Sequence, residues 1–481
     1  MSKSRPTRRA AIASTLGAAA GAAMLPGLAH AAGQARRPNI VFILADDLGY
    51  ADVSCYGRRE YRTQAIDTIA AGGMRFTQAY ANSAVCSATR TALITGRYQY
   101  RLPCGLEEPI GPSNLGMPPE MPTLPSLLKA AGYTTSLIGK WHLGSPPQYG
   151  PLKSGYDHFY GFYAGGSDYF LHDTSLINET GPAHDPGYMT DLLGQRAVSQ
   201  IDAFSKTGKP FFISLHFNAP HWPWEGPDDQ AEAARLAASP QPPGGGIGNL
   251  ADHDGGSMKT FAAMVMRMDQ AIGEVLRAID RNGVAGDTIV IFTSDNGGER
   301  YADTWPFTGK KTELLEGGLR IPAIVSWPGR VPPGTTNPQV MISMDWAPTL
   351  LAAAGAAPDP GHPPDGMNLL PSLVQNQPPV PRSLFWRYLN NAQEAHRDGD
   401  WKYLKILGNT FLFNVVDDPL ERANWKERKP EVYAKLVADY RAWNATMLAL
   451  NPNASTSGFT GADLADHFGV TQRKNLGENA K

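Results

Sequence analysis

The sequence has few cysteines and no paired cysteine motif. Among its 481 residues only Cys55, Cys86 and Cys104 are cysteines. Three cysteines cannot form a disulfide framework, and without a Cys-x-x-Cys pair the sequence does not indicate a zinc site. The residues leave open whether Cys55 and Cys104 pair with each other, and the role of Cys86 needs a separate explanation.

The chain also lacks a large net charge and a long apolar run. Its 43 basic and 45 acidic residues leave a net charge of -2, so no bulk positive field attracts nucleic acid or acidic membranes. No segment after residue 31 is apolar over the length needed to span a bilayer. We therefore expect no nucleic-acid partner and no stable membrane association. Any anion must be recognised by a local cluster of cations.

The first 31 residues have the composition of an export signal. Arg8 and Arg9 precede an Ala/Gly-rich stretch, and Ala29–Ala31 offers a small-x-small cleavage site. The paired arginines indicate the twin-arginine route. Glycine and proline make the stretch only weakly apolar, which disfavours a membrane anchor. We therefore predict a signal peptide over residues 1–31 and a periplasmic or secreted mature protein.

Short apolar runs rich in β-branched and aromatic residues predict the centre of the fold. They occupy residues 40–44, 211–215 and 288–292, and each suits a strand that is buried on both faces of a parallel sheet. A helical repeat of apolar residues from Phe261 to Ile279 separates the last two runs, and Gly283 follows it. This alternation predicts an α/β fold with a mostly parallel sheet. We assign it to a first domain over residues 32–375.

A second, smaller domain is predicted over residues 376–481, because 481 residues are too many for one simple core. Proline-rich sequence at 375–381 has the composition of a linker. Residues 401–406 and 411–415 alternate like hairpin strands around Gly408, and the run 431–447 has a helical pattern. These features predict an α+β domain with an antiparallel sheet.

Polar pairs follow two of the predicted strands directly. Asp46 and Asp47 follow the first strand, and Asp295 and Asn296 follow the strand that ends at Phe292. Ligands of open α/β sheets bind beyond the carboxyl ends of the strands, and such oxygen donors favour Ca²⁺ or Mg²⁺. Either pair alone is better explained as a strand cap or turn. The two together favour a metal site.

Cys86 lies at a predicted helix start. Ser87 is a suitable cap, Gly96 can end the helix, and Arg90 lies one turn on from Cys86 on the same face. A helix N-terminus with a nearby arginine binds anions, and it lowers the pKa of a thiol. From these residues alone, a structural thiol and a catalytic one are equally supported.

The segment from Cys86 to Arg97, CSATRTALITGR, resembles the signature of the type I sulfatases, arylsulfatase-like enzymes of the alkaline phosphatase superfamily whose cysteine is oxidised to formylglycine. Further blocks resemble the family's motifs in the same order and cover nearly the whole mature chain. These blocks are Ala45–Tyr50, Gly139–Gly144, Ser294–Gly298, Lys311 with Glu316–Gly318, Arg397–Tyr403 and Asp418–Glu421.

The resemblance implies an alkaline-phosphatase-like fold, in which helices enclose a large, mostly parallel sheet. It also implies one Ca²⁺ per chain and a formylglycine (3-oxoalanine) made from Cys86 by a formylglycine-generating enzyme. The implied calcium ligands are Asp46, Asp47, Cys86, Asp295 and Asn296. The implied catalytic residues are Cys86, Arg90, Lys140, His142, His221 and Lys311.

Each catalytic residue has an implied role. Arg90 would hold the formylglycine, and Lys140 and Lys311 would bind the sulfate oxygens. His142 would act on the formylglycine hydroxyl, and His221 would face the leaving-group oxygen. The implied reaction is the two-step hydrolysis of a sulfate ester to an alcohol or phenol and inorganic sulfate. Its substrate would be a sulfated small molecule or carbohydrate.

Two positions differ from the family's usual pattern or leave a choice. Ala88 stands where the family more often has proline. Lys310 precedes Lys311, and Lys311 is chosen for its distance from Glu316.

Other interpretations stay open. Taken singly, each lysine is typical of the surface and each histidine of a partly buried position. Trp141 is expected in the core, whereas Trp222 and Trp224 suit either the core or a substrate platform. For the whole chain, one alternative is a phosphonate or phosphodiester hydrolase on the same fold. Another is an exported binding protein for sulfated glycans in which Cys86 is never modified.

Overall fold

A ten-stranded mixed sheet forms the centre of the computed structural model, which describes residues 37–106, 115–238, 256–375, 377–451 and 454. The predicted signal peptide lies outside these residues. In spatial order the strands are β11 (Thr335–Asn337), β2 (Met74–Phe76), β10 (Ala323–Ser326), β9 (Thr288–Ser294), β1 (Asn39–Ala45), β8 (Phe211–His216), β4 (Thr134–Lys140), β5 (His158–Phe162), β6 (Ile177–Asn178) and β7 (Gly181–Pro182).

The central strands of this sheet are parallel, as the sequence predicts. β1 pairs in parallel with both neighbours, so that Val41 lies opposite Ile213 of β8 and Val290 of β9. β4 and β5 extend the parallel part, whereas β10 runs antiparallel to both β9 and β2. Because β1, β8 and β9 are parallel neighbours, their carboxyl ends meet at one edge.

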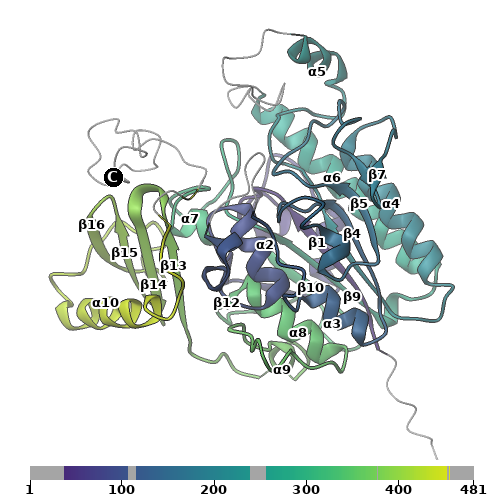
Figure 1. Ribbon diagram of the computed structural model, residues 1–481. Helices are drawn as coiled ribbons and strands as arrows, with labels where there is room; N and C mark the ends of the chain where they lie inside the picture. The colour runs from purple at the N-terminus through teal and green to yellow at the C-terminus, as the bar shows by residue number, and fades with distance from the viewer. Residues whose placement is uncertain (1–36, 107–114, 239–255, 376, 452–453, 455–481) are drawn as a thin grey trace, which may run out of the picture. The chain divides into compact units, whose positions relative to one another are not determined.

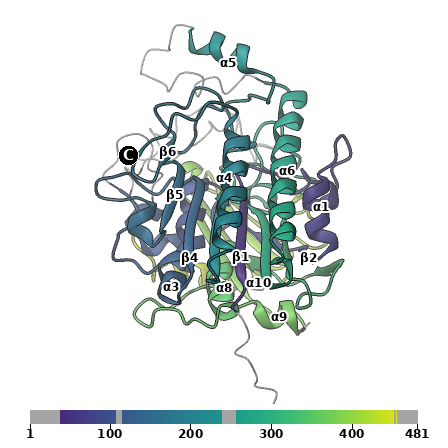
Figure 2. The ribbon, with the colours of Figure 1, turned by 90° about the vertical axis from the view of Figure 1, so that its right-hand side faces the viewer.

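Helices cover both faces of the sheet (Figures 1 and 2). One face is covered by α1 (Gln64–Ala71), α4 (Met189–Phe204) and α6 (Met258–Arg281). The other is covered by α2 (Cys86–Thr95), α3 (Leu124–Ala130), α8 (Trp346–Ala353) and α9 (Leu370–Val374). The helix predicted between residues 261 and 279 is therefore present as α6, and Gly283 follows it with a left-handed φ of 67°.

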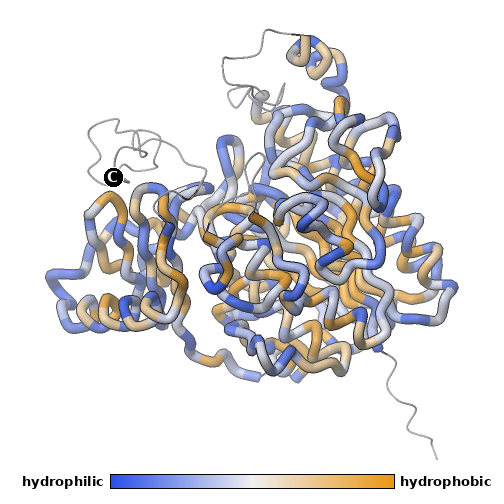
Figure 3. The backbone as a smooth tube through the Cα atoms, in the orientation of Figure 1, coloured by the Kyte–Doolittle hydropathy of each residue, from blue (hydrophilic) through white to orange (hydrophobic). Residues whose placement is uncertain are grey.

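The alternation of side chains along β1 explains these two layers. Val41 and Ile43 belong to the core beneath α4 and α6, whereas Phe42 and Leu44 belong to the core on the opposite face. All of them are buried, as expected for a strand with a period of two and helices on both sides. Figure 3 shows the resulting band of hydrophobic residues along the central strands.

A four-stranded antiparallel sheet forms the C-terminal part of the described chain. Its strands are β13 (Ser383–Tyr388), β14 (Gln393–Asp398), β15 (Trp401–Ile406) and β16 (Asn409–Asn414). α10 (Pro430–Asn444) packs on one face through Leu436 and Tyr440. The predicted antiparallel sheet and helix are thus confirmed. The described residues from Arg37 onward belong to one compact unit, so a domain boundary at residue 375 stays a prediction.

The remaining elements are short. β3 (Ala79–Tyr80) pairs with β12 (Met341–Ile342) in a separate two-stranded sheet, and α5 (Gln230–Ala237) and α7 (Glu316–Leu319) lie in connections between strands. In the part of the chain that the structure describes, no helix has the length and apolar character required to cross a membrane.

Candidate active site

The two predicted polar pairs meet at the carboxyl edge of the sheet. β1 and β9 lie side by side in register up to Ala45 and Ser294, so the residues that follow both strands are adjacent. The backbone N–H of Asp47 donates to Asp295 Oδ1 at 3.2 Å, and Asn296 Nδ2 donates to Asp47 Oδ1 at 2.7 Å. Asp46, Asp47, Asp295 and Asn296 are all buried. Parallel pairing therefore converts two distant sequence pairs into one cluster.

Cys86 is the first residue of α2 and contacts the same cluster. Its Sγ, an oxygen of Asp46 and an oxygen of Asp295 lie within 4.8 Å of one another. Val85, in an extended conformation, precedes the helix, so Ser87 lies inside it and the predicted Ser87 cap is wrong. Gly96 ends the helix in a left-handed conformation, as predicted.

The ionisation of Cys86 also differs from the expectation. Burial raises the pKa of the Cys86 thiol to about 12 and outweighs the opposite effects of Lys140 and Lys311. The predicted lowering of this pKa by the helix N-terminus is therefore wrong, because burial penalises the thiolate more than the nearby cations stabilise it. An unmodified Cys86 is a neutral thiol at physiological pH.

Three cations pair with the three carboxylates. Arg90 Nη2 lies 2.8 Å from Asp295 Oδ2, and Lys140 Nζ lies 2.5 Å from Asp46 Oδ2. The third pair joins Lys311 Nζ to an Asp47 oxygen at 2.7 Å. All three cations are buried, so the interpretation of the two lysines as surface residues is wrong. At the preceding residue, Lys310, the backbone N–H donates a hydrogen bond to the Glu313 carboxylate.

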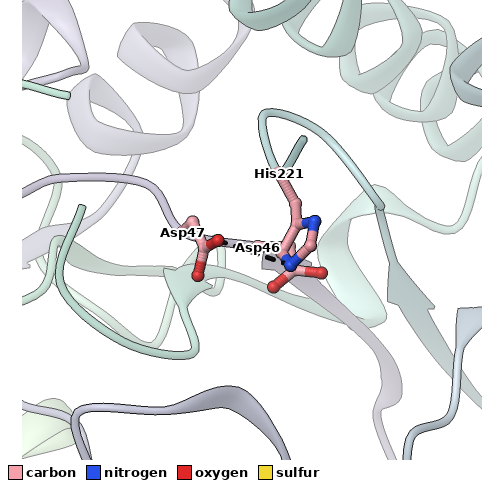
Figure 4. Close-up of side chains that lie close together, drawn as sticks. All are labelled: Asp46, Asp47 and His221. Carbon is pink, nitrogen blue, oxygen red and sulfur yellow. Dashed lines mark ion pairs between the residues drawn. The ribbon is translucent and has the colours of Figure 1, made fainter. Parts of the chain in front are cut away.

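Both predicted histidines lie within this cluster. His142 Nδ1 is 3.3 Å from Cys86 Sγ, and His221 Nε2 is 3.6 Å from Asp47 Oδ2. Figure 4 shows the His221 ring directed toward the carboxylates of Asp46 and Asp47. Burial, followed by the nearby cations, lowers the pKa of both histidines well below its ordinary value. Both imidazoles are therefore neutral at physiological pH.

The arrangement fits an oxygen-coordinated cation. Asp46 Oδ1 and Asn296 Oδ1 are buried without a hydrogen-bond partner, which is costly unless a further group binds them. Burial and the adjacent Asp295 raise the pKa of Asp46 well above its ordinary range. A cation among these carboxylates would relieve their repulsion. A set of carboxylate and amide oxygens suits Ca²⁺ or Mg²⁺.

His216 is a buried member of the site that the sequence analysis missed. It is the last residue of β8, and its Nδ1 lies 3.2 Å from Arg90 Nη1 and 3.1 Å from the carbonyl oxygen of Lys140. Ser214 Oγ contacts its other ring nitrogen at 2.9 Å. His216 thus helps to fix the Arg90 side chain. Its position at the end of a predicted buried strand was the available sequence signal.

Glu299 is a second residue that was missed. Its side chain is 10% exposed, and its Oε2 lies 3.7 Å from Lys311 Nζ. Burial raises its pKa to about 7, although Lys311 opposes this shift. The residue directly follows the block Ser294–Gly298, and this adjacency was the only signal in the sequence.

The three tryptophans near the motifs have different surroundings. Trp141 is buried in the core beneath α3 and α8, as expected. Trp224 is also buried, and its ring packs edge-on against Tyr301 with centroids 5.1 Å apart. Trp222 is half-buried, and its ring centroid lies 4.5 Å from that of His221. The Trp222 ring therefore lies beside a predicted catalytic residue.

Comparison with known proteins gives consistent results. A family model described as Sulfatase matches residues 38–356. The chain is 32% identical over 405 residues to the N-acetylgalactosamine-6-sulfatase of Rattus norvegicus, covering 77% of this chain and 72% of the relative. It is also 32% identical over 393 residues to the arylsulfatase A of Homo sapiens, covering 76% and 73% of the two chains.

Solved structures show the same similarity. The crystal structure of Ps i-CgsB superposes with a TM-score of 0.78 at 30% identity, covering 86% of this chain and 94% of that chain. The phosphonate monoester hydrolase of Agrobacterium radiobacter has a TM-score of 0.60 at 20% identity, over 86% and 96% of the two chains, and shares the fold. The family match and the curated relatives decide between the enzyme classes: the chain belongs to the sulfatase family and is a sulfuric ester hydrolase.

Proposed function

We propose that this protein hydrolyses sulfate esters of carbohydrates by means of a formylglycine formed at Cys86 and a bound calcium ion. One observation carries the proposal. The Cys86 side chain is buried among Asp46 and Asp295 oxygens, and three cations surround the same cluster. A neutral structural thiol has no need of such surroundings, whereas an anion-binding nucleophile does.

The residues present suit both groups. Asp46, Asp47, Asp295 and Asn296 would hold the calcium ion, together with the side chain at position 86. When both groups are in place, formylglycine supplies a hydroxyl nucleophile and calcium supplies Lewis-acid polarisation of the sulfate oxygens.

The three cations would bind and orient the sulfate. Arg90 is fixed by Asp295, by His216 and by the carbonyl oxygen of Lys140, so it would hold the side chain at position 86 in one orientation. Lys140 and Lys311 already lie against carboxylates. Their ammonium groups would also donate to sulfate oxygens as negative charge redistributes. Fixed donors in a buried site stabilise such charge without costly reorganisation.

The two histidines would move protons on opposite sides of the sulfur. His142 is neutral and lies 3.3 Å from the side-chain atom at position 86, so it is placed to accept a proton from that side chain. His221 Nδ1 lies 2.5 Å from the carbonyl oxygen of Trp222, which assigns a proton to Nδ1. Because the imidazole of the free enzyme is neutral, general-acid action needs a second proton on Nε2, which the negative charges of Asp47 and of the bound sulfate would stabilise and which would pass to the departing alcohol oxygen.

The names of two similar proteins support a carbohydrate substrate. The relative from Rattus norvegicus is named for N-acetylgalactosamine-6-sulfate hydrolysis. A second crystal structure of Ps i-CgsB, at 30% identity and a TM-score of 0.78, is a complex with k-i-k-neocarrahexaose and covers 88% of this chain and 95% of that chain. We propose a sulfated sugar as the substrate of this chain too.

Burial of Cys86 supports modification before folding. Only 3% of the residue is exposed in the folded chain, so a formylglycine-generating enzyme would have to act on the unfolded segment. Ala88, where the family more often has proline, lies two residues further along α2. We propose that modification precedes both folding and export to the periplasm or medium.

Mass spectrometry of the peptide that contains Cys86 tests the proposal. We expect an aldehyde at position 86 in active protein, and loss of activity in Cys86→Ala. Cys104→Ser is the matched control, because Cys104 is equally buried but lies elsewhere in the core. A free Cys86 thiol in fully active enzyme would exclude the proposed chemistry.

For export, replacing Arg8 and Arg9 with lysine should retain the protein in the cytoplasm, and an unchanged exported yield would exclude the twin-arginine route.

A further inference from the structure

Glu299 borders the cluster of Asp46, Asp47 and Asp295 but, unlike these three carboxylates, has no cation at hydrogen-bonding distance. Asp46, Asp47 and Asp295 each lie 2.5–2.8 Å from a lysine or arginine nitrogen. Glu299 Oε2 is 3.7 Å from Lys311 Nζ and has no hydrogen-bond partner, although the carboxyl group also interacts with the Asp47 side chain. A buried carboxylate oxygen without a partner is costly. A ligand group that donates to it would remove this cost.

The geometry places Glu299 beside the candidate metal ligands rather than among them. The described chain contains two sets of potential metal-ligand residues, and within each set the ligand atoms lie within 4.8 Å of one another. One contains Asp46, Asp47 and His221, and the other contains Asp46, Cys86 and Asp295. Glu299 belongs to neither set. It lies next to both Lys311 and Asp47, on the same side of the site as His221, since both Lys311 and His221 contact Asp47 Oδ2.

An aromatic ring lies beside His221. The half-buried Trp222 ring lies 4.5 Å from the His221 ring. The edge-on contact between Trp224 and Tyr301 joins the segment that carries Trp222 to the segment that carries Glu299. The two segments are therefore held together. Trp222 flanks His221, and Glu299 flanks Lys311.

This combination matches the chemistry of a sugar ring. A pyranose has apolar C–H surface that packs against an aromatic ring, and hydroxyl groups that donate to a carboxylate. We propose that Trp222 and Glu299 form the subsite for the sugar that carries the scissile sulfate, with Glu299 accepting a hydrogen bond from a hydroxyl that neighbours the ester. The inference rests on the proposed function, because that function places the leaving group beside His221 and Lys311.

A carboxylate at this position also excludes some substrates. A second sulfate or a carboxylate on the neighbouring carbon would lie against Glu299, and the only nearby ammonium group described above, that of Lys311, already pairs with Asp47, so the two anions would repel each other. The subsite is therefore specific for a sugar whose hydroxyl next to the scissile ester is free. It selects against a sugar that is sulfated at both positions.

Binding measurements in a Cys86→Ala background test the subsite without any turnover. The probes are methyl glycoside monosulfates and their monodeoxy analogues, with Kd measured by calorimetry. In this background we expect removal of the neighbouring hydroxyl to raise Kd about tenfold or more, as for a hydrogen bond to a charged group. Adding Glu299→Gln should reduce that penalty to about threefold or less, because the charged acceptor is gone. Glu274→Gln, an exposed carboxylate on α6, should leave the penalty unchanged.

Equal hydroxyl penalties with and without Glu299→Gln, at every ring position, would overturn the assignment to Glu299.

Trp222→Ala supplies a second measurement at a half-buried position where folding is less at risk. It should raise Kd for the glycoside sulfate about tenfold while leaving Kd for methyl sulfate within about twofold, since methyl sulfate has no ring to pack. Equal losses for both ligands would overturn the platform. A free Cys86 thiol in active enzyme would refute the proposed chemistry but would leave these binding results interpretable.

Discussion

Charge pairing at single residues organises the site. Each carboxylate that could hold a metal also contacts a cation that could hold sulfate: Asp46 with Lys140, Asp47 with Lys311, and Asp295 with Arg90. In a buried site, an ion without its partner is far more costly than the pair is stabilising. Metal and sulfate are therefore expected to bind as a coupled set. The same contacts explain why substitutions at these six positions would affect both folding and activity.

His221 gives a prediction that depends on the substrate. If its imidazole protonates the departing oxygen, its loss matters most when that oxygen is a strong base. His221→Ala should therefore slow alkyl and sugar sulfates by about 10²–10⁴-fold, the usual contribution of a general acid. Activated aryl sulfates, whose phenolates leave without a proton, should be slowed only slightly. A kcat/KM series across leaving groups of graded basicity measures this difference.

His142→Ala is the matched control for that series. Its Nδ1 faces position 86 rather than Asp47, so its loss should not depend on leaving-group basicity. It should instead let a covalent sulfated enzyme accumulate, which intact-protein mass spectrometry would detect. If His221→Ala slowed every substrate equally, His221 would be a residue that positions sulfate or metal and not a proton donor.

At the scale of elements, the C-terminal sheet holds the segment that carries Lys311. Gln393 of β14 accepts a hydrogen bond from the backbone N–H of Leu314 and donates to the carbonyl oxygen of Thr312. Glu421 accepts from the backbone N–H of Glu316 at 2.6 Å. Both supporting side chains are buried. Gln393 of this sheet, which contributes no candidate catalytic residue, and Glu421, which follows the sheet, thus fix the backbone directly after Lys311.

We expect Gln393→Leu to lower kcat/KM about tenfold while the protein still folds, because the backbone polar groups that it satisfies cost about 1–3 kcal/mol each when left unpaired. If Gln393 acts through Lys311, adding Gln393→Leu to Lys311→Ala should cause little further loss. Losses that multiply in the double variant would show that Gln393 affects activity by another route. Gln375, which lies at the end of α9 away from this segment, is a suitable control position.

The sequence predicted the secondary-structure elements and the motif residues better than it predicted the pairing of strands and the surroundings of side chains. The runs at 40–44, 211–215 and 288–292 became buried parallel strands because a continuous apolar run has few other stable positions. The antiparallel pairing of Arg75 with Ile324 could not be foreseen, since nothing local relates residues so far apart in the chain. The pKa of Cys86 was predicted in the wrong direction because helix position is visible in sequence, whereas burial is a property of the completed fold.

Across the whole molecule, a buried ion network joins the C-terminal sheet to the α7 segment of the first domain. Lys402 of β15 lies 3.0 Å from Glu316 and 2.9 Å from Glu421, and all three side chains are fully buried. Arg320 contacts the other oxygen of Glu316 at 2.7 Å. Buried networks of this kind fix one arrangement of the elements that they join, because any other arrangement leaves charges unpaired. This network therefore links the stability of the C-terminal sheet to that of the catalytic core.

Lys402→Met should destabilise the protein by about 3–5 kcal/mol, since it leaves two buried carboxylates without their shared cation. Lys405→Met, on the same strand but in a half-exposed pair with Glu394, should cost less than about 1 kcal/mol. Denaturant unfolding of the two variants measures the difference. Similar small losses in both would mean that water or neighbouring arginines already compensate the buried pair.

Removal of calcium is the corresponding prediction for the complete molecule. Three carboxylates meet between β1 and β9, the central strands, so a cation bound there stabilises the folded state and has no site in the unfolded chain. At a free calcium concentration of 100 times Kd, binding adds about 2.7 kcal/mol to the free energy of unfolding. A calcium chelator should therefore lower the Tm of the native protein by several degrees, and added calcium should restore it. Asp295→Asn removes one carboxylate with little change in volume, and its Tm should respond weakly to either treatment. A native Tm that is independent of calcium, in protein shown by elemental analysis to have lost its metal, would contradict the proposed site.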